Sequence, residues 1–173
     1  MKAYFAGGCF WCMEKPYHLM DGVINVESGY CGGQEQDPTY NEVKEQKTAH
    51  RETVSIEFDE TRITYDELLE AYFDNIDPFD DGGQFIDRGH SYTCAVYYVN
   101  EEQKRKAGDM ISRLERDHGR KVAVALEEYI QFWRAEEYHQ DYAGKNPEEY
   151  EKEYEGSGRK AYFEKQKTGS KDN

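Results

Sequence analysis

Two cysteines, Cys9 and Cys12, lie three residues apart directly after a pair of glycines. A thiol attacks as its thiolate, and an ordinary thiol pKa of about 8.5 leaves few per cent ionised at neutral pH. A helix that begins at Cys9 favours the thiolate, because unpaired N–H groups and the positive end of the helix dipole meet there. At helical spacing Cys12 lies on the same face. The pair therefore predicts redox chemistry, with Cys9 as nucleophile and Cys12 as a partner that resolves its oxidised form.

Three other interpretations of this pair stay open. Two buried cysteines need carry no chemistry, since free Cys is often simply part of a core. A lone Cys-x-x-Cys also fits half of a zinc site, but Cys31 and Cys94 stand alone, so we expect no metal. A thioredoxin-like dithiol oxidoreductase is the stronger alternative, because the same motif after a first strand fits it. Against that alternative, the large residues Phe10 and Trp11 fill the gap and would form an apolar wall beside the nucleophile.

Glu52 is the second residue whose type and position suggest chemistry. Across residues 52–59, Val54, Ile56 and Phe58 alternate with polar residues, which predicts a strand with one apolar and one polar face. By parity Glu52 belongs to the apolar face, where burial raises the pKa of a carboxyl until it keeps its proton near neutrality, as a general acid must. If the strand begins one residue later, Glu52 is solvated instead. The sequence leaves both alternatives open.

The elements that position these residues alternate between strands and helices. Capping signals mark two of the helices, Thr64 with Glu67 three residues on, and Asn100 with Gly119 as the stop. The remaining elements follow from hydrophobic periodicity and from breakers such as Asp77-Pro78. In chain order we expect strand 3–6, helix 9–20, extended segment 23–30, a polar surface loop through 37–40, strand 52–59, helix 64–77, loop 80–89, strand 92–99, helix 100–119, strand 122–133, and a helix around residue 138.

This order of elements predicts an α+β fold, built on one mixed, mainly antiparallel sheet with helices packed on it. Strand 92–99 is apolar on both faces, which is typical of a central strand. The 173 residues suit a single domain, 1–173, in which 146–173 is a charged C-terminal extension that we expect to fray from residue 168 onward.

The charge balance, 22 basic against 36 acidic residues, gives a net charge of −14. That balance argues against nucleic-acid and anionic-membrane partners, since no basic stripe is present to neutralise phosphates. No segment approaches the roughly 20 apolar residues that span a bilayer, and the N-terminal segment lacks the pattern of a signal peptide. We therefore expect a cytoplasmic protein, in which four cysteines serve redox chemistry or packing rather than a disulfide framework.

Six short motifs together resemble one enzyme family, the A class of peptide methionine sulfoxide reductases. Their order and spacing are specific to it, and they span residues 3 to about 142. The motifs are Gly-Cys-Phe-Trp at 8–11, Gly-Tyr-x-Gly-Gly at 29–33, Pro-Thr-Tyr at 38–40, His-Arg-Glu at 50–52, Asp-Arg-Gly-His-Ser-Tyr at 87–92 and Glu-Tyr-His-Gln at 137–140. The resemblance implies a two-layer α/β sandwich and reduction of the S epimer of methionine sulfoxide, peptide-bound and free.

The resemblance also implies a role for each matching residue. Cys9 occupies the position of the attacking thiolate, and Phe10 and Trp11 that of the wall that holds the ε-methyl group of the substrate. Glu52 matches the acid that protonates or hydrogen-bonds the sulfoxide oxygen. Three further positions match by resemblance only: Tyr40 and Tyr92, whose hydroxyls share that oxygen, and Asp87, an acidic residue that helps to hold the site.

The cysteine pattern departs from the family in one respect. Many members carry resolving cysteines in a C-terminal tail, and here no cysteine follows Cys94. Cys12 is the first candidate for the resolver, by proximity, and Cys31 the alternative, because the glycines beside it would let it move. Cys94 is expected to be core. The family implies thioredoxin as the external reductant, with glutaredoxin left open. We expect no bound cofactor and a monomer. A non-catalytic sulfoxide-binding module is the remaining alternative class.

Overall fold

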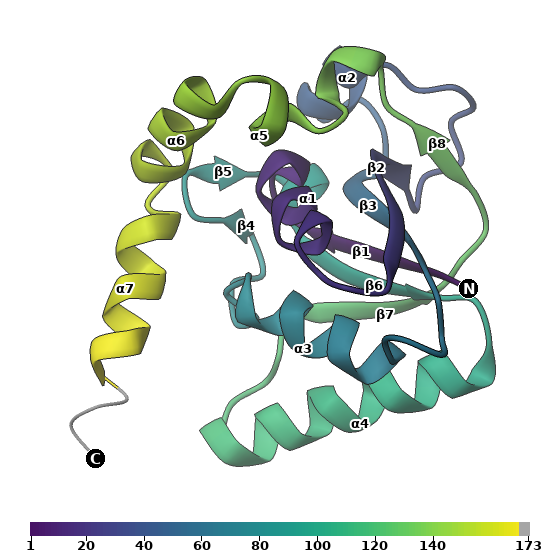
Figure 1. The fold of residues 1–173 in the computed structure, drawn as a ribbon, viewed down its shortest axis with the longest axis vertical. Coiled ribbons are helices and arrows are strands. Elements are labelled where there is room, and N and C mark those ends of the chain that lie inside the picture. The colour runs from purple at the N-terminus through teal and green to yellow at the C-terminus, as the bar shows by residue number, and fades with distance from the viewer. Residues whose placement is uncertain (170–173) are drawn as a thin grey trace.

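The computed structural model of the protein describes residues 1–169. Residues 1–169 form eight strands, seven α-helices and two short 3-10 helices (Figure 1). The strands are β1 (Lys2–Gly7), β2 (Val23–Cys31), β3 (Arg51–Phe58), β4 (Gly83–Gln84), β5 (Asp87–Arg88), β6 (Cys94–Tyr98), β7 (Val124–Glu128) and β8 (Phe132–Arg134). The helices are α1 (Phe10–His18), α2 (Tyr40–Lys44), α3 (Tyr65–Asp74), α4 (Glu101–His118), α5 (Tyr142–Lys145), α6 (Pro147–Gly156) and α7 (Arg159–Gly169).

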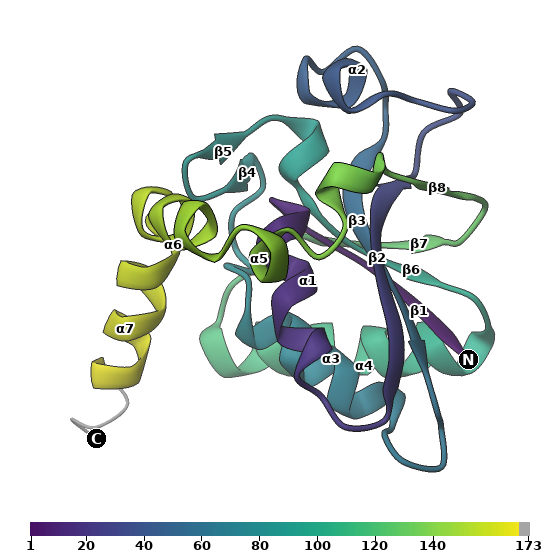
Figure 2. The same cartoon turned by 45° about the horizontal axis from the view of Figure 1, so that its top comes forward.

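Six of the strands form one sheet in the order β7-β6-β1-β3-β2-β8, in which only β6 and β7 run parallel. The two edge strands are joined by residues 129–131 alone. Edges of a flat six-stranded sheet would lie about 24 Å apart at the usual strand spacing. The four peptide units from Glu128 to Phe132 reach about 14 Å at most. The sheet therefore curls until its edges approach one another, as the two views show (Figure 2).

Side chains from alternate residues of each strand build two separate cores. On one face Phe5, Val54 and Ile56 pack against helices α1, α3 and α4. On the other face a smaller cluster, which includes Tyr4 and Tyr97, lies under the connection between the two edge strands. The main core therefore sits between the sheet and its helices, and it supplies the apolar surface against which α1 is held.

Helix α1 begins next to the end of β1 because Gly8 turns the chain between them. Gly8 has φ +85°, and a Cβ there would lie 2.7 Å from the Nη2 atom of Arg159. Only glycine adopts this backbone conformation without strain and leaves room for the guanidinium. Cys9 is then the N-cap residue of α1, as the glycine pair predicted.

The expected fold class is confirmed, because the sheet is mixed and mainly antiparallel with helices packed on it. The strand expected at 92–99 is β6, shortened by a 3-10 turn at its start and interior in the sheet. The helices expected at 64–77 and 100–119 are α3 and α4, with the predicted caps at Thr64 and Asn100.

Three expectations are corrected by the structure. The loop through residues 37–40 leads into helix α2, whose N-cap Thr39 exchanges two hydrogen bonds with Glu42. The single strand expected at 122–133 is two strands at opposite edges of the sheet, because the curled sheet brings those edges together. Finally, β3 is buried on both faces, Thr53 and Ser55 included, since the second cluster covers the face that was expected to be solvated.

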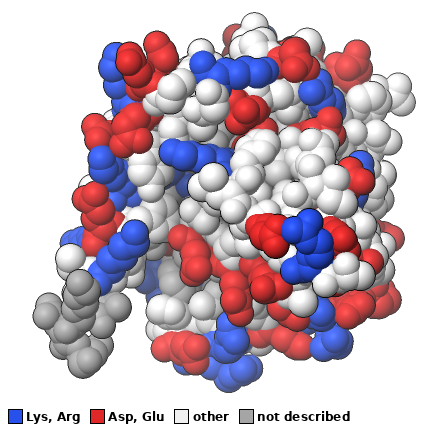
Figure 3. All heavy atoms as spheres, viewed as in Figure 1, with Lys and Arg blue, Asp and Glu red and all other residues white. Residues whose placement is uncertain are grey.

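The charged segment from residue 146 consists of helices α6 and α7 as far as Gly169, past the expected point of fraying, and residues 170–173 lie outside the described part. Acidic and basic side chains intermingle on the face drawn in Figure 3. Among residues 1–169, no helix is long and apolar enough to cross a membrane.

Candidate active site

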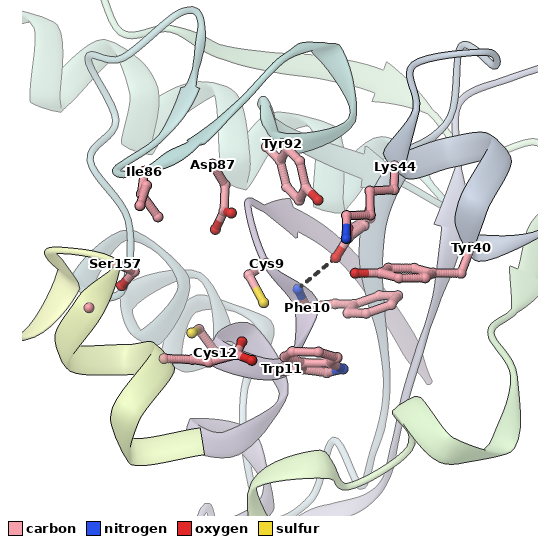
Figure 4. A pocket seen from close by; sticks show the side chains of 13 residues that line it. Cys9, Phe10, Trp11, Cys12, Tyr40, Lys44, Ile86, Asp87, Tyr92 and Ser157 are labelled. Atoms are coloured by element: carbon pink, nitrogen blue, oxygen red, sulfur yellow. Dashed lines mark hydrogen bonds between the residues drawn. The ribbon is translucent and has the colours of Figure 1, made fainter. Parts of the chain in front are cut away.

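A pocket of about 420 Å³ opens at the N-terminus of α1 (Figure 4). Its walls come from α1, α2, β3, the β5 region and α6, segments that are far apart in the sequence. Apolar, acidic and sulfur-bearing side chains all line it. The residues are Cys9, Phe10, Trp11, Cys12, Tyr40, Lys44, Glu52, Ile86, Asp87, Tyr92, Glu153, Gly156 and Ser157. The fold thus gathers in one cavity eight of the nine predicted site residues.

Glu52 is only 2% exposed and points inward, the first of the two alternatives that the sequence left open. Its Oε1 accepts a hydrogen bond of 3.2 Å from the backbone N–H of Phe10, at the start of α1. Its Oε2 is buried and has no partner among residues 1–169. Burial raises the pKa of this carboxyl to about 8, with the negative charge of Asp87 acting in the same direction. At neutral pH Glu52 therefore holds a proton next to an empty space, as a proton donor requires.

Cys9 and Cys12 are neighbouring thiols at the first turn of α1. Cys9 is partly exposed in the pocket and Cys12 is buried. The pKa of Cys12 is lowered to about 7, chiefly because Cys9 donates a hydrogen bond to its sulfur. The pKa of Cys9 is raised for the same reason, and burial adds to the effect. The first thiol to ionise is therefore Cys12, and not Cys9 as expected from the start of the helix, so Cys9 can attack once its proton passes to the sulfur of Cys12.

The tyrosines and Asp87 surround the mouth of the same cavity. Tyr40 comes from α2, and Tyr92 from the 3-10 turn before β6. Burial and the nearby Glu52 raise the pKa of both phenols, so they stay protonated as hydrogen-bond donors. Asp87 also has a raised pKa because it is partly buried, an effect that the positive charges of Arg159 and Lys44 oppose.

The aromatic wall is held by a histidine. Phe10 is 1% exposed and packs against Tyr40. The indole Nε1–H of Trp11 donates a 3.1 Å hydrogen bond to Nδ1 of His139. Because an indole nitrogen only donates, His139 carries its proton on Nε2, and burial lowers its pKa so that it stays neutral. Trp11 also stacks on Tyr142 at 3.8 Å, which fixes the plane of its ring.

The other two cysteines lie elsewhere. Cys31 is on the opposite face of the sheet, in a strand paired on both sides, and its thiol bonds to the carbonyl of Gln131 at 3.2 Å. These contacts hold Cys31 away from the pocket in this structure. Cys94 is buried in the main core, where burial raises its pKa to about 12, in agreement with a packing role.

Several pocket residues were not singled out in the sequence. Lys44 belongs to a helix that was read as loop, and Glu153 and Ser157 belong to the charged C-terminal segment. His139 stands in a noted motif but received no role. Among residues 1–169, no group of three or more His, Cys, Asp or Glu side chains is arranged to hold a metal ion.

Known proteins share both the sequence and the fold. A family model described as peptide methionine sulfoxide reductase matches residues 1–171. Peptide methionine sulfoxide reductase MsrA of Bacillus licheniformis is 47% identical over 94% of this chain and 91% of its own length.

Solved structures of two further relatives have the same fold. Reduced Mxr1 of Saccharomyces cerevisiae matches with a TM-score of 0.80 at 28% identity, covering 86% of both chains. Methionine sulfoxide reductase A of Corynebacterium diphtheriae gives 0.76 at 28% identity, over 84% of this chain and 74% of that one. Mxr1 has also been solved in complex with Trx2, a structure that matches at 0.54 and 18% identity. The match over nearly the whole chain, together with a buried acid facing a thiol pair, establishes that this protein belongs to the peptide methionine sulfoxide reductase family.

Proposed function

We propose that this enzyme reduces methionine S-sulfoxide in a thiol cycle that begins with attack by Cys9. The observation that carries the proposal is the arrangement in one pocket of Cys9 and a buried Glu52 whose free Oε2 holds a proton. The sulfur of a sulfoxide is a poor electrophile until its oxygen is protonated or strongly hydrogen-bonded. A neutral carboxylic acid and two phenols are suitable donors for that oxygen.

In the first step the sulfoxide oxygen accepts hydrogen bonds from Glu52, Tyr40 and Tyr92, while Phe10 and Trp11 surround the methyl group. Cys9 attacks the sulfur as its remaining proton moves onto Cys12. The oxygen is transferred to Cys9, which becomes a sulfenic acid, and methionine leaves. The sulfur of methionine gains the two electrons that the sulfur of Cys9 loses, so the step needs no further reductant.

In the second step Cys12 attacks the sulfur of the Cys9 sulfenic acid. An S–S bond forms, the S–O bond breaks, and the hydroxide leaves as water after it gains a proton. Cys12 lies in the same turn as Cys9, whereas Cys31 is across the sheet. An external dithiol then reduces the disulfide. The complex of yeast Mxr1 with Trx2 supports thioredoxin as that dithiol.

The substrate needs to insert only the end of its side chain. We therefore infer that peptide-bound and free sulfoxide both serve, with stereochemical preference for the S epimer carried by the family resemblance. Four free thiols suit a reducing compartment such as the cytoplasm.

Replacement of the nucleophile tests the first step. Cys9→Ser should abolish formation of methionine from a methionine S-sulfoxide peptide with dithiothreitol as reductant, measured by chromatography. Cys94→Ser is the matched control, because that thiol is buried in the main core and does not line the pocket, and it should retain turnover. Substantial turnover by Cys9→Ser would contradict the proposal.

Replacement of the resolver tests the second step. Cys12→Ser should form one equivalent of methionine per enzyme yet lose cycling with thioredoxin, thioredoxin reductase and NADPH. Cys31→Ser should cycle normally. If Cys12→Ser cycles as fast as the wild type and Cys31→Ser does not, the resolver role belongs to Cys31.

A further inference from the structure

Helices α6 and α7 place a buried arginine beside the thiol pair. Arg159 is 1% exposed although it opens a strongly charged helix. Its Nη2 donates to the carbonyl of Gly7 at 2.7 Å, and its Nη1 to the carbonyl of Asn75 at 2.9 Å. Its Nε is buried and has no hydrogen-bond partner among residues 1–169. A buried cation is costly unless it stabilises negative charge nearby, and Arg159 favours the ionised forms of both Asp87 and Cys12.

Tyr150, from α6, packs against α1 at Lys15, one turn beyond Cys12, and hydrogen bonding from its hydroxyl lowers the pKa of Cys12. Tyr150 is 4% exposed, so this contact is shielded from water. The ammonium of Lys15 stands 4.6 Å from the centre of the Tyr150 ring. A cation over the face of a phenol withdraws electron density from the ring and makes the hydroxyl a stronger donor. The three side chains Lys15, Tyr150 and Arg159 therefore direct positive potential at Cys12.

Charged and titratable groups on every element packed around Cys12 act on it. Arg159 and Tyr150 favour its thiolate, and Asp87 opposes it. These groups are Cys9 and Lys15 at either end of the same stretch of α1, Glu52 on β3, Asp87 on β5, Tyr150 and Tyr154 on α6, and Arg159 on α7. After Cys9 has been oxidised, the hydrogen bond from its thiol is gone. The phenol and the guanidinium are then the groups that remain to stabilise Cys12 as an anion.

We propose that Tyr150 and Arg159 are positioning residues for the resolving step, which hold Cys12 as the thiolate that attacks the Cys9 sulfenic acid. This proposal rests on the proposed function, in which Cys12 is the resolver. It assigns a role to α6 and α7, which supply a phenol and a guanidinium to the thiol pair. The sequence indicated only that this segment is a charged extension. In the reaction the thiolate of Cys12 displaces hydroxide from the sulfur of Cys9, and the hydroxide takes a proton from solvent to leave as water.

The test measures ionisation of Cys12 directly. In the Cys9→Ser variant, which replaces the neighbouring thiol by a hydroxyl, thiolate absorbance at 240 nm is followed against pH. Burial raises the pKa of Cys31 and Cys94 far above this range, so Cys12 alone titrates below about pH 9. Adding Tyr150→Phe should move the midpoint up by about one pH unit, because one hydrogen bond to the anion is lost. Tyr154→Phe, the stacked neighbour on the same helix, is the matched control and should leave it in place, because its phenol is neutral in this range and gives Cys12 no hydrogen bond.

A second measurement uses the enzyme with all four cysteines. One equivalent of sulfoxide is added without reductant, and disulfide formation is followed by rapid quenching with a thiol-trapping reagent and mass spectrometry. At pH 6, Tyr150→Phe should slow the resolving step about threefold. The fraction of Cys12 present as thiolate falls about tenfold, but the more basic thiolate is a better nucleophile and recovers part of that loss. Arg159→Lys, which keeps the charge but not the forked geometry, should also slow the step. Melting temperatures check that each variant is folded.

The outcomes separate this inference from the function on which it rests. If the wild type forms a Cys9–Cys12 disulfide but neither Tyr150→Phe nor Arg159→Lys changes the Cys12 midpoint or the resolving rate, the positioning role is overturned and the proposed cycle stands. If the wild type forms no such disulfide, Cys12 is not the resolver, and both proposals fail.

Discussion

Replacing Glu52 by Gln should make the protein more stable at alkaline pH, and by an amount that the structure sets. The pKa of Glu52 is about 8 in the folded protein, against an ordinary value of 4.5. Between these values the folded state binds a proton that the unfolded state has lost, so stability falls as pH rises. Below pH 4.5 Glu52 is protonated in both states and costs no stability. Above that pH the loss in free energy of unfolding grows by about 1.4 kcal/mol per pH unit, and it reaches roughly 5 kcal/mol once pH passes 8.

Glutamine preserves the local contacts and cannot ionise. Its oxygen accepts from the N–H of Phe10, as Oε1 of Glu52 does, and its NH₂ stands where the neutral acid carries its proton. We expect Glu52→Gln and the wild type to have similar free energies of unfolding at pH 5. By pH 9 the variant should be more stable by about 3 to 5 kcal/mol, a large share of the 5 to 15 kcal/mol typical of a domain.

The assay is urea unfolding of both proteins at pH 5, 7 and 9, followed by tryptophan fluorescence. Glu14→Gln serves as a matched control, because Glu14 is equally buried but its carboxylate accepts from Ser28 Oγ at 2.8 Å and from the N–H of Asp141 at 2.9 Å. Loss of one accepting oxygen there should destabilise the protein by about 1 to 3 kcal/mol. If the difference between Glu52→Gln and the wild type does not change from pH 5 to 9, Glu52 does not hold a proton in the folded protein, and its role as proton donor is wrong.

Three further predictions concern the pocket. The single-turnover rate of methionine formation should rise with pH as the thiol pair loses its first proton near 7 and fall as Glu52 ionises near 8; a rate that still climbs above pH 9 would contradict this. Tyr40→Phe and Tyr92→Phe should each slow that step by about 10- to 100-fold, since each removes a donor to the oxygen; rapid-quench kinetics that match the wild type would exclude them as donors. Trp11→Ala should raise KM by about 10-fold with a smaller effect on kcat, because it removes apolar contact with the methyl group; steady-state kinetics against a sulfoxide peptide decide this, and a selective loss of kcat would be the contrary result.

Local patterns predicted the chemical centre well because it depends on neighbours in the chain. The glycine pair and the cysteine spacing placed Cys9 at the start of a helix, and the alternation in residues 52–59 directed Glu52 inward. The capping box at Thr64 located helix α3 for the same reason. Thr39 and Glu42 carry the same signal, but the short helix that they begin has no apolar period, so the loop interpretation prevailed there.

The features that were missed depend on contacts between distant segments. Arg159 is buried because its side chain packs against a distant segment, where it donates a hydrogen bond to the carbonyl of Gly7, 152 residues away in the sequence. Nothing within its own charged helix distinguishes it from Lys160, which is exposed and paired with Glu155. The split into β7 and β8 likewise follows from the curling of the whole sheet, which no window of sequence reports. One local sign was available, since Tyr150 and Tyr154 stand at helical spacing in an otherwise charged stretch.

The measurement that tests the central claim most directly is a map of the disulfide formed after one turnover. The enzyme is given one equivalent of methionine S-sulfoxide without reductant, remaining thiols are alkylated, and the chain is cleaved after glutamate. Cleavage after Glu14, Glu27 and Glu35 leaves Cys9 and Cys12 in one peptide, 1–14, and Cys31 in another, 28–35. The account predicts one equivalent of methionine and peptide 1–14 lighter by two hydrogens, with peptide 28–35 alkylated. A cross-link between the two peptides would contradict it. So would formation of methionine while Cys9 is recovered alkylated, because alkylation shows that its thiol was not oxidised.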